Sequence, residues 1–478
     1  MTVPPRGSAE ARDAVTNPRP MRYPEVTSPE VMTRRGWWLI VLNFLLPGSA
    51  QILAGNKRLG RIGLAATLAL WIVAIVGIVL VLVWRGAVLS LAPNWFFLLA
   101  VQIILIAYVL LWVVLTIDTL RLARLVRTGP AARFFIAGVS VLLLLVASVP
   151  SLYAAQLAAT TRSTISSIFG GGTVVPPSDG YYNILLLGAD SGTGRDSMRF
   201  DSISVVSVNA STGATTITGI PRDLPNAPFS EGPMQELYPN GFEGHISDSC
   251  GWGSGINQLR NAAEVCREDR GEGLYPNAVD ESSSPSIEAT KDAAEGMLGI
   301  EIPYYVFIDM EGFAHLIDAL GGVEITVTER LPEGPGPDYD GQPAEEWATG
   351  WIEEGTQLMD GETAQWYARS RYTTSDWDRM ERQRILQQAI LAQFTPSNVL
   401  SRFSEIMSAG SDLVQTDVPD GLLPTLLDLG LKAREQAVST IELTPENGID
   451  SEYPDYTLVR ELVADALHPA SPTAAPEE

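Results

Sequence analysis

The sequence predicts an α/β fold, a layered mixed β-sheet flanked by helices, preceded by an α-helical transmembrane region. Two patterns predict this arrangement. Before residue 155, three apolar runs each reach about 20 residues, the length that crosses the hydrocarbon core of a bilayer. Beyond residue 181, strand-type alternation and helix-type periodicity take turns along the chain, with some strands paired as hairpins. Strands that alternate with helices are typical of a layered domain around a mixed sheet.

The charge changes sign where the hydropathy changes. Residues 1–180 carry 15 Lys and Arg against 6 Asp and Glu, whereas residues 181–478 carry 17 against 50. A nucleic-acid partner would need a broad basic face. The acidic second part of the chain therefore argues against nucleic-acid binding.

The membrane region is predicted over residues 36–154. The segment before it, residues 1–35, is polar and rich in Pro and Arg, which predicts a disordered cytoplasmic tail. The region contains three apolar runs without internal charge, and we expect each of them to span the membrane. These runs are Ile62–Trp84, Trp95–Thr116 and Phe134–Tyr153.

A fourth apolar run, Trp37–Ala54, is shorter than a full span and is interrupted by Pro47-Gly48-Ser49. Basic residues flank it on both sides, among them Arg35 and Lys57. Since positive charge stays on the cytoplasmic side, the run is predicted to enter and return as a re-entrant or interfacial hairpin. A fourth full span is the alternative.

The preference of positive charge for the cytoplasmic side also predicts the membrane topology. The loop after the second span is basic and suits the cytoplasm, because it contains Arg121, Arg124, Arg127 and Arg133. Three crossings from a cytoplasmic start then place everything after Tyr153 outside, whereas four would place it inside. The sequence therefore predicts a multi-pass protein of the cell membrane with an extracytoplasmic domain.

The part after the membrane divides into four predicted segments. Residues 155–180 are rich in Ser, Thr, Gly and Pro and predict a flexible linker. Residues 181–400 form the main domain, residues 401–467 a C-terminal extension packed on it, and residues 468–478 a disordered tail. The predicted strands are Tyr182–Leu187, Ser202–Val208, Thr215–Ile220, Tyr304–Ile308, Val323–Val327 and Ser439–Leu443. The predicted helices are Ile287–Leu298, Met310–Leu320, Glu362–Tyr367, Trp377–Phe394, Leu422–Ala437 and Tyr456–Leu467.

A loop-rich segment, residues 223–284, contains both cysteines of the chain, Cys250 and Cys266. In an exported domain two such cysteines are expected to form a disulfide; free thiols are the alternative. A closed loop of this size would contribute about 3 kcal/mol by the chain-entropy model. We therefore expect an ordered insertion held by a disulfide.

Arginines are concentrated at a few places in the acidic domain. Of the 17 basic residues beyond position 180, eight lie in three short segments. They are Arg195 and Arg199, then Arg222, then Arg369, Arg371, Arg379, Arg382 and Arg384. The sequence has no G-x-S-x-G, H-E-x-x-H or P-loop motif. Because guanidinium groups bind phosphate oxygens in pairs and keep their charge, the clustering predicts a pyrophosphate site.

Two carboxylates accompany these arginines at strand ends. Asp190 ends the first predicted strand, and Asp201 precedes the second, two residues after Arg199. Hard oxygen ligands completed by phosphate oxygens suit Mg²⁺. Asp is also a common turn residue at such positions, which is the alternative for each of them.

One face of the helix predicted over Trp377–Phe394 combines polar and apolar side chains. Arg379, Arg382 and Gln383 share this face, which continues through Leu386. An apolar stripe faces inward, so the charged residues at its start need a partner. A solvated face of ion pairs with Glu381 is the alternative.

Five segments occur in an order that resembles the LytR-CpsA-Psr family. They are N-I-L-L-L-G-A-D (183–190), R-F-D-S (199–202), I-P-R-D (220–223), Y-A-R-S-R-Y (367–372) and D-W-D-R-M-E-R-Q (376–383). The resemblance covers about residues 181–396. It departs from the family pattern in the long polar loop after Arg222 and in the multi-span membrane region.

The resemblance implies a phosphotransferase of the cell envelope. Such an enzyme moves an anionic glycopolymer, such as teichoic acid or arabinogalactan, from a polyprenyl-pyrophosphate carrier onto peptidoglycan through a phosphodiester. It implies Asp190 and Asp201 as Mg²⁺ ligands and an apolar tunnel for the prenyl chain between sheet and helices. The implied catalytic residues that hold the pyrophosphate are Arg199, Arg222, Arg369, Arg371 and Arg379, and Arg382 and Gln383 complete the substrate pocket.

The general base is left open between Asp223 and Asp376. Two other functions also remain open. A polyprenyl-pyrophosphate phosphatase would use the same pocket with water as the acceptor. A non-enzymatic regulator that binds the lipid carrier would keep the arginines without needing Asp190 and Asp201 together.

Overall fold

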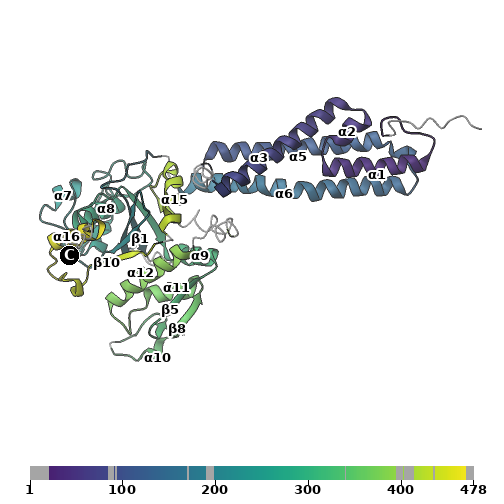
Figure 1. The fold of residues 1–478 in the computed structure, drawn as a ribbon. Helices are drawn as coiled ribbons and strands as arrows, with labels where there is room; N and C mark the ends of the chain where they lie inside the picture. The colour runs from purple at the N-terminus through teal and green to yellow at the C-terminus, as the bar shows by residue number, and fades with distance from the viewer. Residues whose placement is uncertain are drawn as a thin grey trace, which may run out of the picture. The chain divides into compact units, whose positions relative to one another are not determined.

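The computed structural model describes residues 21–83, 91, 94–169, 172–189, 199–339, 341–393, 402, 414–433 and 436–469. Contacts between residues separate two compact units, which divide between Ala159 and Thr160 (Figure 1). Each unit is described by itself.

The first unit is helical. Its helices are α1 (Pro29–Leu45), α2 (Ser49–Ala54), α3 (Lys57–Val83), α5 (Trp95–Ala123), the short η1 (Leu125–Arg127) and the first part of α6 (Ala132–Ile168). Among the described residues, three helical segments are long and apolar enough to cross a membrane: Lys57–Leu80, Trp95–Arg127 and Ala132–Ile168. Three such helices agree with the three predicted spans.

The interrupted apolar run forms two helices rather than one. The chain turns at Gly48, whose φ of 97° lies in the left-handed region. A Cβ at this position would lie 2.3 Å from the backbone nitrogen of Leu64, so only glycine allows α3 to approach this closely. The break predicted at Pro47-Gly48-Ser49 is therefore present.

The predicted tail and the predicted linker are both shorter in the structure, because local helix signals extend farther than expected. Helix α1 begins at Pro29, inside the predicted tail, where the side chain of Ser28 accepts a hydrogen bond from the backbone N–H of Val31. Helix α6 continues to Ile168, through the first half of the predicted linker. Residues 155–168 include several helix-favouring Ala, Leu and Gln residues, and Gly and Pro begin only after them.

The second unit is built on a six-stranded mixed sheet with the order β10-β3-β2-β1-β4-β9. The strand bounds are β1 Tyr181–Ala189, β2 Phe200–Asn209, β3 Thr215–Gly219, β4 Tyr304–Asp309, β9 Val414–Thr416 and β10 Ser439–Glu442. Strand β1 pairs antiparallel with β2 and parallel with β4. The predicted mixed sheet flanked by helices is confirmed.

One face of this sheet is packed by α8 (Pro285–Leu298) and α16 (Tyr456–Leu467). Alternate residues of β1, Leu185 and Leu187, are buried there in one hydrophobic core with residues of both helices. We call this the packed face.

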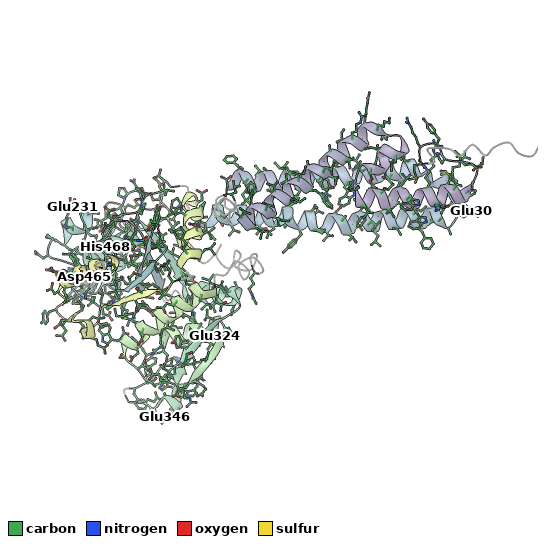
Figure 2. All side chains as sticks on the ribbon, viewed as in Figure 1. Glu30, Glu231, Glu324, Glu346, Asp465 and His468 are labelled. Carbon is green, nitrogen blue, oxygen red and sulfur yellow. A yellow bond between two sulfur atoms is a disulfide. The ribbon has the colours of Figure 1, made fainter. Side chains whose placement is uncertain are left out.

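The opposite face is covered by α9 (Met310–Leu320), α12 (Asp376–Gln393) and α15 (Leu423–Ala433). A second core lies among α9, α12 and the elements between them. Those elements are β5 (Val323–Val327), β6 (Leu331–Glu333), α10 (Ala344–Trp347), β7 (Gly350–Ile352), β8 (Gly355–Met359) and α11 (Gly361–Arg369). Exposed acidic residues such as Glu324 and Glu346 lie on the outside of this part (Figure 2).

The predicted C-terminal extension is an integral part of the sheet. It supplies both edge strands, β9 beside β4 and β10 beside β3, and it adds α16 to the packed face. The fold therefore needs this region to complete its sheet, and the domain does not end near residue 400.

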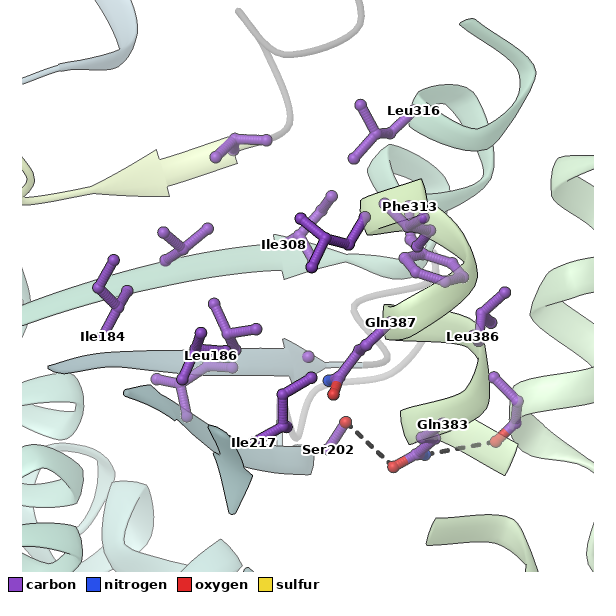
Figure 3. Close-up of a pocket in the computed structure, with 18 of the residues that line it drawn as sticks. Ile184, Leu186, Ser202, Ile217, Ile308, Phe313, Leu316, Gln383, Leu386 and Gln387 are labelled. Carbon is purple, nitrogen blue, oxygen red and sulfur yellow. Dashed lines mark hydrogen bonds between the residues drawn. The ribbon is translucent and has the colours of Figure 1, made fainter. Parts of the chain in front are cut away.

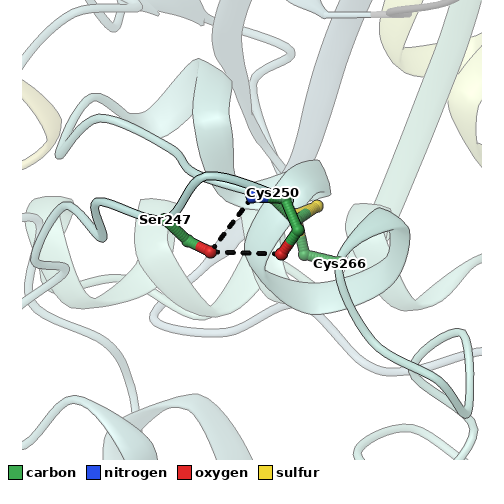
Figure 4. Close-up of a disulfide and its surroundings, with 4 residues drawn as sticks. Ser247, Cys250 and Cys266 are labelled. Atoms are coloured by element: carbon green, nitrogen blue, oxygen red, sulfur yellow. Dashed lines mark hydrogen bonds between the residues drawn. A yellow bond between two sulfur atoms is a disulfide. The ribbon is translucent and has the colours of Figure 1, made fainter.

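The loop-rich segment contains only short helices, α7 (Pro233–Leu237), η2 (Ile256–Gln258) and η3 (Asn261–Val265). Its Met234, Phe242 and Ile256 side chains are fully buried in the core of the packed face. Cys250 and Cys266 form the predicted disulfide, with their Cα atoms 5.6 Å apart (Figure 4). The segment is thus an ordered insertion.

Candidate active site

A cavity of about 520 Å³ lies between the sheet and the helices α9, α12 and α15 (Figure 3). Most of its walls are aliphatic or aromatic. Residues that line it include Ile184, Leu186, Val206, Ile308, Phe313, Leu386, Ile390, Leu426 and Leu429. A space of this size and chemistry suits an apolar ligand. We call it the apolar cavity, and it lies where the resemblance placed a tunnel between sheet and helices.

Polar residues also line the cavity, and those from β2, α11 and α12 include Asp201, Ser202, Arg369 and Gln383. The hydroxyl of Ser202 donates to Oε1 of Gln383 at 3.0 Å, and Nε2 of Gln383 donates to the carbonyl of Ala368 at 3.3 Å (Figure 3). These bonds tie the three elements together beside the predicted phosphate site. Ser202 was not among the predicted site residues, although it ends the R-F-D-S segment.

Arg222 lies in the turn after β3 and connects two of the predicted carboxylates. Its Nη1 donates to Oδ1 of Asp201 at 2.6 Å, and its Nε lies 3.3 Å from Oδ2 of Asp223. Burial acts to lower the pKa of Arg222, but nearby carboxylates outweigh burial and raise it. The guanidinium is therefore held as a cation next to the cavity.

Arg379 is the most buried of the predicted phosphate ligands in the described part of the chain, with 5% of its surface exposed. Its Nη2 donates to Oδ2 of Asp376 at 2.9 Å. Its Nε is buried without a hydrogen-bond partner among the described residues. An unpaired buried donor on a cation is costly, and the oxygen of an anionic ligand would satisfy it.

The pKa of Arg379 is lowered, first by burial. The positive charges of Arg222 and Arg371 lower it further, while the carboxylates of Asp376 and Asp201 oppose them. Two ion pairs, Arg222 with Asp201 and Arg379 with Asp376, thus interact electrostatically with each other and with Arg371. We call these five residues the arginine cluster.

Arg371 of this cluster and the two predicted arginines outside it, Arg369 and Arg199, have different surroundings. Arg369 lines the cavity, with its guanidinium carbon 5.2 Å from the centroid of the Trp366 ring. Arg371 is exposed next to Tyr372. Arg199 is exposed directly before β2.

Arg382 has a different environment from Arg379, although both lie on the inward face of α12. Its Nε donates to the carbonyl of Tyr367 at 3.1 Å, and its Nη2 donates to the carbonyl of Ser370 and to Thr374 Oγ1. Tyr367 lies in the last turn of α11, and Ser370 and Thr374 follow the helix. Arg382 therefore holds the segment that carries Arg369 and Arg371.

The metal site predicted from two carboxylates is only partly described. Asp190 lies outside the described residues. Asp201 lines the polar part of the cavity, with one carboxylate oxygen bonded to Arg222 and 31% of its side chain exposed. Within the described ranges, no three His, Cys, Asp or Glu side chains gather as a metal site. The oxygen donor of Asp201 has the chemistry that Mg²⁺ prefers.

The model of the LytR_cpsA_psr family matches residues 152–227 and 286–467, more than half of the chain. Biofilm regulatory protein A of Streptococcus mutans is 27% identical over 288 residues, covering 58% of this chain and 60% of that protein. A second relative, from Halalkalibacterium halodurans, is the polyisoprenyl-teichoic acid–peptidoglycan teichoic acid transferase TagU. It is 24% identical over 269 residues, covering 55% of this chain and 70% of that protein.

Among solved structures, protein gbs0355 of Streptococcus agalactiae matches with a TM-score of 0.42 and 23% identity. The match covers 60% of this chain and 88% of that one. The chain thus spans 60% of the length of the first relative and 70% of the second. Because the family model covers more than half of its residues, the chain belongs to the LytR-CpsA-Psr family.

Proposed function

We propose that this protein is a phosphotransferase that moves an anionic glycopolymer from a polyprenyl-pyrophosphate carrier onto peptidoglycan, forming a phosphodiester. The observation that carries the proposal is an apolar cavity whose polar lining adjoins the arginine cluster. A lipid pyrophosphate has these two chemistries in one molecule. The H. halodurans relative, a transferase named for a polyisoprenyl-linked teichoic acid and peptidoglycan, supports it.

The chain's residues would act on the donor as follows. The prenyl chain occupies the apolar cavity, and the pyrophosphate lies against Arg222, Arg371 and Arg379. These cations neutralise the negative charge that develops on the phosphoryl oxygens, usually a large part of catalysis in such transfers. The unpaired Nε of Arg379 gains its acceptor when the donor binds.

The reaction exchanges one P–O bond for another. The oxygen of an acceptor sugar hydroxyl forms a bond to the phosphorus that carries the glycopolymer. The bond from this phosphorus to the bridging oxygen breaks, and polyprenyl phosphate leaves with the electron pair. The hydroxyl proton goes to a carboxylate, for which Asp223 and Asp376 are the candidates.

Mg²⁺ is proposed to be held by Asp190 and Asp201, and it would supply further positive charge to the pyrophosphate. Asp201→Asn should lower Mg²⁺ affinity and turnover together, because it removes one negative charge with little change of shape. A Mg²⁺ titration of turnover, and of metal binding by calorimetry, tests this proposal. Full activity of the wild type in chelator would remove the metal from the mechanism.

We also propose that the second unit lies outside the cytoplasm. The three apolar helices and the basic loop between the last two support this topology. A reporter that works only in the cytoplasm should be silent when fused after Ser178 and active when fused within residues 121–133. Activity after Ser178 would reverse the assignment.

The main experiment uses the full-length chain in lipid vesicles, with a polyprenyl-pyrophosphate-linked disaccharide as donor and peptidoglycan fragments as acceptor. Wild type should release polyprenyl phosphate and form a phosphodiester, both detected by mass spectrometry. Leu186→Trp should block this reaction, because it fills the cavity with a bulky ring. The matched control is Leu358→Trp, at a leucine that is 68% exposed.

The two alternatives give different products. Release of polyprenyl phosphate without a phosphodiester, whatever acceptor is supplied, identifies a phosphatase. Donor binding without any cleavage identifies a carrier-binding regulator.

A further inference from the structure

Asn257 of the loop-rich segment is hydrogen-bonded to the candidate active site, at a position that the family match does not include. Asn257 lies in residues 228–285, between the two matched stretches. Its Nδ2 donates to Oδ1 of Asp223 at 3.0 Å, and its backbone N–H donates to the carbonyl of Arg222, also at 3.0 Å. Asn257 therefore holds both the side chain and the backbone of the I-P-R-D turn.

We propose that Asn257 is a positioning residue that orients Asp223 as the base for the acceptor hydroxyl. Through Asn257, the disulfide-linked loop-rich segment contributes to the active site. The proposal rests on the proposed function. It chooses Asp223 over Asp376 as the group that takes the proton.

The carboxylate of Asp223 is restrained at both oxygens. Asn257 donates to Oδ1, and Nε of Arg222 lies 3.3 Å from Oδ2. The Asp223 side chain is nevertheless 68% exposed. A carboxylate accepts about four hydrogen bonds. A lone pair therefore remains toward solvent, where an acceptor sugar can approach it.

Asp376 is bonded differently. Its Oδ2 accepts from Nη2 of the buried Arg379, and its side chain is 40% exposed. A proton added to this carboxylate would weaken the ion pair of a buried cation. Asp223 is bonded to a neutral amide and, at 3.3 Å, to Arg222, which keeps its shorter bond to Asp201 when Asp223 is protonated, so protonation there disturbs less.

The segment is built to lie tightly against the turn. Asn257 itself is 6% exposed, so its amide has little freedom to turn away. A Cβ at Gly255 would lie 3.1 Å from the carbonyl oxygen of Arg222 and 3.1 Å from Cα of Asp223. The disulfide closes a loop around both residues, from Cys250 to Cys266. The tight approach and the closed loop together limit how far Asn257 can move from Asp223.

Asn257 acts in one step of the transfer. As the acceptor oxygen bonds to phosphorus and the polyprenyl phosphate leaves, the hydroxyl proton passes to Asp223. Asn257 keeps the receiving oxygen in place, and it neither gains nor loses a proton. Its loss should therefore slow turnover without weakening donor binding, because the arginine cluster and the cavity are unchanged.

The test measures transfer by the full-length chain in vesicles with the polyprenyl-pyrophosphate-linked disaccharide. Asn257→Ala should lower kcat roughly tenfold with little change in the KM for donor, as expected for one lost hydrogen bond to a charged group. Asn277→Ala, an exposed asparagine in the same segment, is the matched control and should retain wild-type kcat. Gly255→Ala keeps the Asn257 amide and the Asp223 carboxylate but shifts the segment away from the turn. It should therefore lower kcat by a smaller factor than Asn257→Ala.

A double-mutant cycle separates positioning from general support of the fold. Asn257→Ala should have no further effect on kcat in an Asp223→Asn background, because the residue acts through Asp223. The same tenfold loss in both backgrounds, or wild-type turnover in either Asn257→Ala or Asp223→Asn, overturns the inference. If Asn257→Ala does not fold, judged by its unfolding transition and its intact disulfide, Gly255→Ala decides alone: wild-type kcat there overturns it.

Failure of the proposed function has a different signature. A wild type that makes no phosphodiester refutes the transferase before any variant is compared. A wild type that transfers normally while the Asn257 and Asn277 variants behave alike refutes only the inference about Asn257.

Discussion

Neighbouring residues of β1 point to opposite faces of the sheet and meet different surroundings. Leu185 is fully buried in the core of the packed face, whereas Leu186 lines the apolar cavity on the other face. Both faces of the central strand are apolar, so composition does not distinguish them. What distinguishes them is whether helices fill the space, as α8 and α16 do, or leave room for a ligand.

The packed face should therefore carry stability, and the face with the cavity should carry function. The largest expected effect tests this contrast directly. Leu185→Ala should lower the free energy of unfolding by about 2–5 kcal/mol, because it creates a void in a filled core. Leu186→Ala should cost only about 1 kcal/mol, because its side chain already borders empty space. Chemical denaturation of both variants checks the difference, and equal losses would contradict it.

The disulfide should contribute to stability, because its loop-rich segment buries Met234, Phe242 and Ile256 in the core of the packed face. Replacing Cys250 and Cys266 together by Ser should cost about 3 kcal/mol of stability by the chain-entropy model. Differential scanning calorimetry measures the loss. The wild-type protein, prepared natively, should show no free thiol by alkylation and mass spectrometry. Two alkylated cysteines would refute the disulfide.

Substitutions in the arginine cluster should lower activity rather than stability. Arg222→Ala should lower transfer at least about tenfold, since one lost charge-assisted contact costs on the order of 1.5–3 kcal/mol. Arg222→Lys should recover only part of it, because an ammonium cannot bind two oxygens as a fork. Steady-state transfer rates test this expectation. Arg330→Ala is the control, at an exposed ion pair with Glu353, and an equal loss there would argue against a specific site.

A smaller effect concerns pH and the packed face. Burial raises the pKa of Asp292 on α8 to about 6, opposed by a hydrogen bond from Tyr275. The folded state then binds a proton more tightly than the unfolded state. Stability should rise as pH falls from 7 through 6 toward 4, by an amount on the order of 1–3 kcal/mol.

Asp292→Asn should flatten this dependence, because the amide cannot ionise and its oxygen can still accept from Tyr275. Thermal unfolding midpoints of wild type and variant across pH 4–8 measure the effect. Asp280→Asn, at an exposed residue of the loop-rich segment, should keep the wild-type slope. A wild-type midpoint that does not change between pH 7 and pH 5 would show that Asp292 is not perturbed.

Elements that have local start and stop signals were predictable from the sequence alone. Helix α9 and strand β5 have the predicted bounds, because Asp309 caps the helix and Gly321 ends it in the left-handed conformation. Helix α16 is likewise as predicted, and Asp455 caps it. The inward face of α12 was also predicted from spacing alone, and Leu386 on it is buried.

The partners of those faces depend on contacts between distant parts of the chain, so they could not be predicted from the sequence. Strand β9 has three residues, Val414–Thr416, and exists because β4 offers it a partner. Arg379 and Arg382 share one helix face, yet the first lies in the arginine cluster and the second is bonded to carbonyls at the end of α11. Periodicity states which side chains point inward, but partners from distant parts of the chain decide what each of them does. The contact of Asn257 with Asp223 has no local signal at all, because it joins residues 34 positions apart.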